Sequence, residues 1–198
     1  MRRWKLLGLL IVVALLGAGC GKPPEAQVEK ATAALKAAEA AGAPQYAPDA
    51  WGRAKLAVDR MRTELEKQAK RFALFRSYGK VRTLAGDAVR LAEQALTDAN
   101  AKKTQQRGEV TSMIAEIDAS LAAARNQLSR LPRTRGLDAA SLRSTLNEAG
   151  RQLDQARADL NAGAFDRAMQ VAAQARDGVT RVFKAIEKVT GIPASRKR

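Results

Sequence analysis

The sequence predicts an all-α protein, because apolar residues recur at helical spacing and strand patterns are missing. From residue 81 onward, small apolar side chains return every three or four positions and so lie on one helix face: Val81, Ala85, Ala88, Ala92, Ala95 and Ala99. Ala and Leu dominate the apolar positions, and aromatic residues make up only 4% of the chain. This composition is typical of long helices with slim cores. No run rich in Val, Ile and Thr alternates with polar residues between turn signals, so a sheet is not expected.

The first part of the chain contains two helical segments and a reversal. An Ala-rich helix is expected at 26–41, where the following Gly and Pro end it. A second helix begins at 48 with Asp49 as a capping residue, and it should reach about residue 75. Its apolar contacts are expected from Leu56, Met61, Leu65 and Phe72. Residues 77–79 then predict a tight reversal.

A single long helix is expected next, because no proline interrupts residues 79–131. At ~1.5 Å per residue it would be on the order of 80 Å long. Its apolar face stops at the polar stretch 100–109 and resumes displaced by one residue, which favours two packing units. The second face consists of Val110, Ile114, Ile117, Leu121, Ala124, Leu128 and Leu131.

Two further helices complete the predicted fold. After a turn at 132–136, Asp138 caps a helix with apolar residues at heptad-like spacing, and 161–163 reverse the chain into the last helix, whose apolar face runs from Phe165 to Ile186. We therefore expect antiparallel helical hairpins or three-helix bundles with heptad-like Ala/Leu packing. They form two units, 26–105 and 106–191, joined by one long helix and followed by a basic tail, 192–198.

An internal duplication is one interpretation of this organisation. Residues 28–49 and 117–138 have the same length, and each is followed by a helix, a turn with an aromatic residue and an Ala-stepped return. The other interpretation is chance similarity between Ala-rich segments. Both remain open from the sequence.

The first 19 residues have the pattern of a signal peptide. Arg2, Arg3 and Lys5 precede an apolar run at 6–19 that is shorter than the ~17 to 25 residues needed to span hydrocarbon. Small residues then lead directly into Cys20, the only cysteine of the chain. This arrangement resembles the lipobox of bacterial lipoproteins, although the position three before the cysteine is Gly17 where a bulky aliphatic residue is usual. The resemblance implies cleavage before Cys20 and lipidation of its thiol.

Lipidation would make residues 20–25 a short tether and the protein an envelope lipoprotein. The alternative is an ordinary secretory signal that ends by chance in a cysteine. Gly21, rather than Asp, resembles the default for sorting to the outer membrane in enteric bacteria. The expected location is therefore the outer membrane, facing the periplasm, with the lipid on Cys20 as the membrane contact.

Composition disfavours most enzyme chemistries. The chain has no histidine, and lipidation would consume its one thiol, so the usual proton shuttle, metal ligands and thiolate nucleophile are missing. No pair of acids lies in a setting that would tune a general acid. We expect no enzyme activity, no cofactor and no metal site. Nucleic acid is also not expected as a partner, because an exported chain rarely meets it and no DNA- or RNA-binding module is present.

The strongest candidate for a binding surface is a basic stretch. Residues 52–83 contain ten cations and three acids, a local charge of +7. Nine of these cations are candidates for binding anionic envelope polymers or lipid headgroups: Arg53, Arg60, Arg62, Lys67, Lys70, Arg71, Arg76, Lys80 and Arg82. The alternative is an ordinary solvated helix face. Four aromatic residues nearby could form a partner-binding patch or close the end of a slim core: Trp51, Phe72, Phe75 and Tyr78.

Two segments resemble a family of uncharacterised, Ala-rich bacterial lipoproteins built on a helical hairpin and catalogued as a domain of unknown function. The matching features in 40–61 are a small-Gly-Ala turn, the run Tyr46-Ala47-Pro48-Asp49, and alanines with a Leu on one helix face. Residues 161–175 resemble the second helix of the same hairpin, and also the second helix of a tetratricopeptide repeat. The resemblance implies localisation and fold, and it implies no activity.

Two function classes follow from these observations. The first is a non-catalytic, lipid-anchored helical scaffold or interaction lipoprotein that meets envelope proteins or anionic envelope polymers. The second is a tetratricopeptide-like accessory or assembly factor of an envelope machine. A concave groove with exposed apolar residues would favour the second class, and a smooth charged bundle would favour the first. The oligomeric state and the specific partner do not follow from the sequence.

Overall fold

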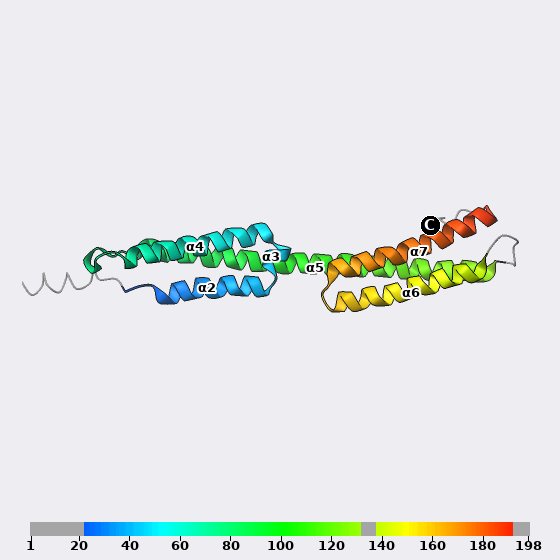
Figure 1. Ribbon diagram of the computed structural model, residues 1–198, viewed down its shortest axis with the longest axis horizontal. Coiled ribbons are helices and arrows are strands. Elements are labelled where there is room, and N and C mark those ends of the chain that lie inside the picture. Colours follow the sequence, from blue (N-terminus) through cyan, green and yellow to red (C-terminus); the bar gives the residue numbers. More distant parts are fainter. Residues whose placement is uncertain (1–21, 132–137, 192–198) are drawn as a thin grey trace, which may run out of the picture. The chain divides into compact units, whose positions relative to one another are not determined.

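The computed structural model describes residues 22–131 and 138–191, and all regular structure in these two ranges is helical (Figure 1). The all-α prediction is confirmed. The predicted signal peptide, Cys20, the turn at 132–136 and the basic tail at 192–198 lie outside the described residues. In chain order the elements are α2 (Glu25–Ala40), α3 (Ala43–Tyr46), α4 (Pro48–Ala69), η2 (Ala73–Phe75), α5 (Gly79–Arg130), α6 (Ala139–Asn161) and α7 (Phe165–Thr190).

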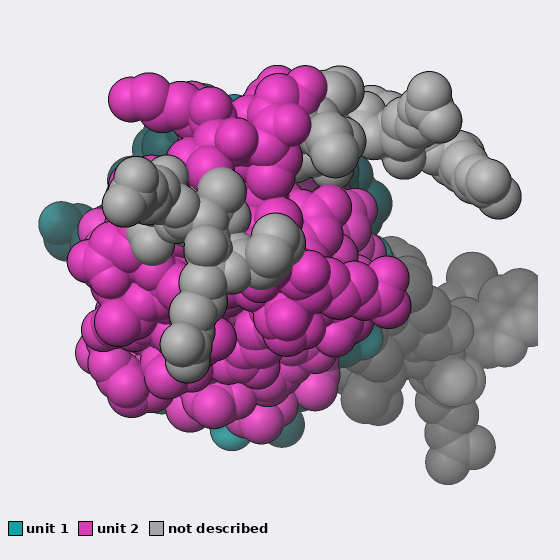
Figure 2. All heavy atoms as spheres, turned by 90° about the vertical axis from the view of Figure 1, so that its right-hand side faces the viewer, with its two compact units in different colours: residues 1–103 teal, residues 104–198 magenta. Residues whose placement is uncertain are grey.

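The chain forms two compact units, divided between Lys103 and Thr104 and coloured separately in Figure 2. Helix α5 crosses this boundary, as the proline-free stretch predicted. In the first unit, α2 and α4 pack against the first part of α5. In the second unit, α6 and α7 pack with the remainder of α5. Arg125 on α5 donates to the carbonyl of Leu146 on α6 at 3.4 Å, for example.

The core of the first unit is slim because small side chains line the helix contacts. One cluster, near the start of α5, combines Ala31, Val58, Met61, Tyr78, Val81, Ala85 and Ala88. A second cluster is made of alanines: Ala38, Ala43, Ala50, Ala54, Ala92, Ala95 and Ala99. The stripe on α5 that the sequence predicted is therefore buried as expected. Alanine at these positions allows the helix axes to approach closely.

The polar segment of α5 keeps the register of its buried stripe. Between buried Ala99 and Val110, the half-buried positions are Lys103 and Gln106, so the spacing is four, three, four. The displacement noticed in the sequence is thus one extra four-residue step, which a helix of 3.6 residues per turn requires at intervals. The Lys103 ammonium lies 5.1 Å from the centroid of the Tyr46 ring, a cation–π contact within the first unit.

The start of α4 differs from the prediction in its cap. Ala47 occupies the N-cap position, and Asp49 lies in the first turn without a side-chain capping hydrogen bond. Pro48 at the first helical position makes such a cap less necessary, because one N–H that would need a partner is missing. The chain also forms the short helix α3, which the sequence did not predict. Gly42 precedes it with a φ of 79°, a conformation that favours glycine.

The end of α4 is the largest correction to the predicted fold. The helix stops at Ala69 instead of continuing to residue 75, and the reversal extends over residues 70–78. Phe72 and Leu56 were predicted to make core contacts, but they are 70% and 50% exposed.

The four aromatic residues of the predicted patch do not form one cluster. Trp51 packs on the alanine cluster at the start of α4, Tyr78 is buried, and Phe75 is 73% exposed.

The second unit reverses its chain in a much shorter turn. Asp138 caps α6 as predicted, accepting from the backbone N–H groups of Ala140 and Ser141 at 3.2 and 3.0 Å. Three residues then connect α6 to α7, with Gly163 at a φ of 76°. Asp159, 8% exposed, pairs with Arg167 of α7 at 3.3 Å across this turn.

Candidate functional site

The connection between α4 and α5, residues 70–78, has the features of a surface built for contact. It contains the 3-10 helix η2 and connects α4 to α5 with side chains that point to solvent: residues 70–77 are all exposed. The turn begins where Lys70 closes α4 and ends where Tyr78 enters the core. Its backbone is therefore held at both ends by packed helices.

A buried polar pair, Gln68 and Glu64, holds this turn in place. Gln68, 4% exposed, donates from Nε2 to Oε1 of Glu64 at 2.8 Å, and its own Oε1 accepts from the backbone N–H of Ser77 at 3.1 Å. Glu64 in turn pairs with the Lys80 ammonium of α5 at 3.3 Å. These contacts join the last turns of α4 to the first turn of α5. The turn is thus positioned by side chains on both helices.

The carboxyl group of Glu64 has a lowered pKa. The hydrogen bond from Gln68 is the largest cause, and the hydrogen bond and charge of Lys80 and the charge of Lys67 act in the same direction. Burial opposes them, because it disfavours the charged form. The ionised carboxylate is therefore the form that holds Gln68 and Lys80 in place.

Arg76 closes the other side of the turn. Its Nε donates to the carbonyl of Arg71 at 2.9 Å, and its Nη2 donates to the carbonyl of Ala69 at 3.1 Å. These carbonyls lie at and just beyond the C-terminus of α4, where backbone acceptors lack partners within the helix. A positive charge there also interacts favourably with the helix dipole. Arg76 is thereby a structural residue of the turn as well as a surface cation.

Three large apolar side chains project from this turn, and we call them the apolar tip: Phe72, Leu74 and Phe75. Their exposed fractions are 70%, 73% and 73%. The two phenyl rings lie next to each other, with centroids 6.5 Å apart and planes inclined by 47°. Among the residues that the structure describes, the only other large apolar side chain of comparable exposure is Leu56 at 50%. Exposed apolar side chains gathered at one place indicate an interaction surface.

Six cations precede or follow the apolar tip in the sequence, and we call them the turn cations: Lys67, Lys70, Arg71, Arg76, Lys80 and Arg82. No acid occurs between residues 67 and 86. Lys80 is paired with Glu64, and Arg76 binds backbone carbonyls. The remaining four have no acidic partner within 4 Å among residues 22–131 and 138–191. The turn thus combines apolar side chains with unneutralised positive charge.

The nine candidate cations of the sequence do not form one site. All nine are exposed, but Arg53 lies near the start of α4 and Arg60 and Arg62 near its middle, whereas the turn cations gather at its end. The sequence predicted the charge of this surface but not the apolar tip, because helical spacing assigned Phe72 to a core face. The signal that could have found it is the run Phe-Ala-Leu-Phe between Arg71 and Arg76, with cations directly on both sides.

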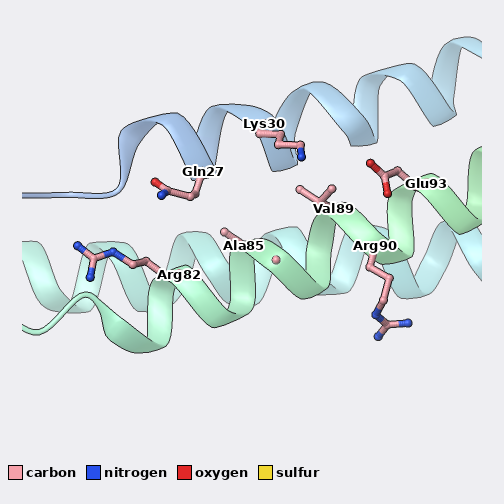
Figure 3. A pocket seen from close by; sticks show the side chains of 8 residues that line it. Gln27, Lys30, Arg82, Ala85, Val89, Arg90 and Glu93 are labelled. Carbon is pink, nitrogen blue, oxygen red and sulfur yellow. The ribbon is translucent and has the colours of Figure 1, made fainter.

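A groove between α2 and α5 opens near the same end of the first unit (Figure 3). It has a volume of about 370 Å³ and is lined by Gln27 and Lys30 of α2 and, on α5, by Arg82, Ala85, Gly86, Val89, Arg90 and Glu93. Five of these eight residues are polar or charged by type, while apolar atoms contribute the larger part of the groove surface. Because Gln27 and Arg82 line one groove, the start of α2 lies beside the start of α5 and hence near the turn.

The described residues lack two other kinds of site. In residues 22–131 and 138–191, no helix combines the length and the apolar character needed to cross a bilayer. Over the same ranges, no three Asp, Glu, His or Cys side chains gather in a way that could hold a metal ion. Comparison of the chain with protein-family models, curated proteins and solved structures finds no match to any of them.

Proposed function

We propose that this protein is a non-catalytic helical scaffold of the bacterial cell envelope, anchored by lipid on Cys20 and facing the periplasm, with the outer membrane as its expected location. The observation that carries the proposal is the order of residues 1–20: cations, then an apolar run too short to span a bilayer, then small residues and the only cysteine. A lone cysteine at this position has a direct explanation as the acceptor of a lipid.

The start of the fold is compatible with such an anchor. Helix α2 begins at Glu25, five residues after Cys20. Five extended residues span at most roughly 18 Å, so a lipid on Cys20 would hold the beginning of α2 close to the bilayer surface. The turn between α4 and α5 lies at that end of the first unit.

The surface of the first unit favours a scaffold over a tetratricopeptide-like assembly factor. An assembly factor that grips one client would be expected to present apolar side chains inside a concave groove. The groove between α2 and α5 offers no large apolar side chain to a client, because its only apolar lining side chains are the small ones of Ala85 and Val89. The exposed apolar side chains lie on a turn at the end of a hairpin.

The test is whether Cys20 carries lipid. In cells fed an alkyne fatty-acid analogue, the full chain should be labelled, whereas Cys20→Ser should lose the label and accumulate as a precursor that retains residues 1–19. Gly21→Ala is the matched control, because it changes the adjacent residue and keeps the thiol, and it should remain labelled. Continued labelling of Cys20→Ser would contradict the lipoprotein assignment.

A further inference from the structure

We propose that the turn at residues 70–78 is a membrane-binding element, which inserts the apolar tip into the interfacial layer of an anionic lipid bilayer while the turn cations other than Arg76 and Lys80 contact lipid phosphates. The inference deepens the proposed function, since the anchor would bring this turn to a bilayer. It goes beyond it, because it assigns a second membrane contact that needs no acyl chain.

Contact of the apolar tip with water is unfavourable in free energy. Two Phe and one Leu side chain, each 70% or more exposed, present apolar area that gains nothing from the protein core. Insertion into the headgroup and upper acyl region would remove this area from water. The proposal gives the exposed side chains a partner of matching polarity.

Contacts on both sides of the apolar tip hold it outward. Gln68 fixes the backbone at Ser77, and Arg76 fixes it at Ala69 and Arg71. Tyr78 is 4% exposed and packs in the core directly after the turn. The presentation of the tip is therefore set by contacts of its neighbours, and Phe72, Leu74 and Phe75 belong to neither core cluster of the first unit.

The positive charge of the turn also favours contact with an anionic bilayer. The turn cations place positive groups on both sides of the tip, and no acid interrupts residues 67–86. Lys and Arg can lay their methylene stems along an apolar surface and direct the charged group to a polar layer. A bilayer with anionic headgroups supplies such a layer directly above an apolar one. The arrangement of the turn matches these two layers.

The position of the turn within the first unit also favours contact with a bilayer. Gln27 of α2 and Arg82 of α5 line one groove, so the first turns of both helices lie at the same end of the unit (Figure 3). The chain that precedes α2 leads back to Cys20 within a few residues. An anchor on Cys20 and the apolar tip would therefore reach the same bilayer together, and the second contact would cost little additional ordering.

The second unit provides an internal comparison. Its α6–α7 turn reverses the chain with only residues 162–164, and the aromatic residue that follows, Phe165, is 9% exposed. A reversal between antiparallel helices thus needs few residues and no exposed aromatic side chain. The longer α4–α5 turn contains additional residues, and these carry the apolar tip.

The first experiment places a reporter in the tip. The chain has two tryptophans, Trp4 and Trp51, so a form beginning at Gly21 keeps one, together with every described helix. With Trp51→Phe and Phe75→Trp, the indole should emit at shorter wavelength on vesicles containing phosphatidylglycerol, and brominated lipid tails should quench it. Vesicles of phosphatidylcholine alone should give little change. Circular dichroism verifies that the double variant keeps its helices.

The second experiment measures affinity for the same vesicles. Truncation by Phe72→Ala, Leu74→Ala and Phe75→Ala should weaken binding by about tenfold for each side chain. The matched control is Leu56→Ala, which removes an exposed Leu side chain roughly 20 Å before the end of α4 at 1.5 Å per residue, and it should leave affinity unchanged.

The results separate insertion from adsorption by charge. Binding that persists after triple truncation, with unshifted and unquenched emission of the reporter, would overturn the proposal and leave charge alone as the cause. Failure to bind anionic vesicles would overturn it too, and the tip would then suit a protein partner. Because this form lacks Cys20, neither outcome depends on lipidation, and loss of labelling in Cys20→Ser leaves the vesicle results untouched.

Discussion

At the scale of single residues, polar side chains determine the shape of the candidate site. Gln68 occupies a position of α4 that points into the bundle, where an apolar residue would be expected. It is satisfied on both sides, because it donates to Glu64 and accepts from the backbone of Ser77. A buried amide without these partners would be costly. At this position of α4, the side chain therefore holds the turn in place and does not add to the apolar core.

The lowered pKa of Glu64 predicts an acid-sensitive contribution to stability. A depressed folded-state pKa stabilises the fold above the unfolded value, near 4.5, and this contribution is lost as the pH falls through the lower folded value. Glu64→Gln should therefore reduce the melting temperature at pH 7, and the difference from the unchanged protein should shrink as the pH falls below 4.5. Thermal melts from pH 7 to about pH 3 measure this directly.

Glu66→Gln is the matched control for this effect. Glu66 is exposed on the same helix and makes no ion pair with the described residues. Its replacement should change the melting temperature less than Glu64→Gln at pH 7. Equal effects of the two substitutions would show that the contacts of Glu64 with Gln68 and Lys80 do not stabilise the turn.

At the scale of elements, substitutions at two glycines test helix α5 and the α6–α7 turn separately. Gly108 lies within α5, and a Cβ added there would meet no atom within 4 Å. Gly163 lies in the α6–α7 turn with a φ of 76°. Gly108→Ala should raise the free energy of unfolding by about 0.5–1 kcal/mol, because Ala loses less backbone entropy in a helix. Gly163→Ala should lower it by roughly 1–2 kcal/mol, because a Cβ is strained in the left-handed region.

Denaturant unfolding followed by circular dichroism measures both variants. The opposite signs make the pair informative, since each removes one glycine and adds one methyl group. Destabilisation by Gly108→Ala would indicate that the middle of α5 is not helical in solution. A neutral Gly163→Ala would indicate that the α6–α7 turn has a different backbone conformation.

At the scale of the whole molecule, positive charge is the dominant property. The chain carries +15, and removal of residues 1–19 would leave +12. Reversal of Arg60, Arg62, Lys67, Lys70 and Arg71 to Glu changes the charge of residues 52–83 from +7 to −3 and leaves the buried Val58 and Met61 intact. Binding to anionic vesicles or lipopolysaccharide should fall strongly at low salt. At high salt the difference should narrow, because exposed charges are screened over ~8 Å already at physiological ionic strength.

The control for this reversal uses the second unit. Changing five of its exposed cations to Glu alters the net charge equally: Arg143, Arg176, Arg181, Lys184 and Lys188. If the basic stretch is the binding surface, the second-unit variant should retain most of its affinity in a vesicle sedimentation assay. Equal losses would assign the attraction to net charge, and unchanged binding of both variants would make the basic stretch a solvated helix face.

The sequence by itself determined the helical class, the buried stripe of α5 and the cap at Asp138. These features depend on local spacing: the 3.6-residue period places Val81, Ala85 and Ala88 on one face, and a capping carboxylate acts on N–H groups two and three residues away. The predicted long helix without proline is likewise a property of consecutive residues. Short-range rules suffice for such features.

Only the tertiary structure decided where α4 ends and what its last aromatic residues do. The spacing of Phe72 relative to Met61 and Leu65 is as helical as that of the core residues, so the pattern extended the helix by six residues too many. Contacts distant in the sequence hold this end of the helix: Gln68 binds the backbone of Ser77, Arg76 binds the carbonyl of Ala69, and Lys80 on α5 meets Glu64 on α4. These contacts join residues 7 to 16 positions apart, outside the reach of a helical pattern. The exposure of the apolar tip follows from that ending.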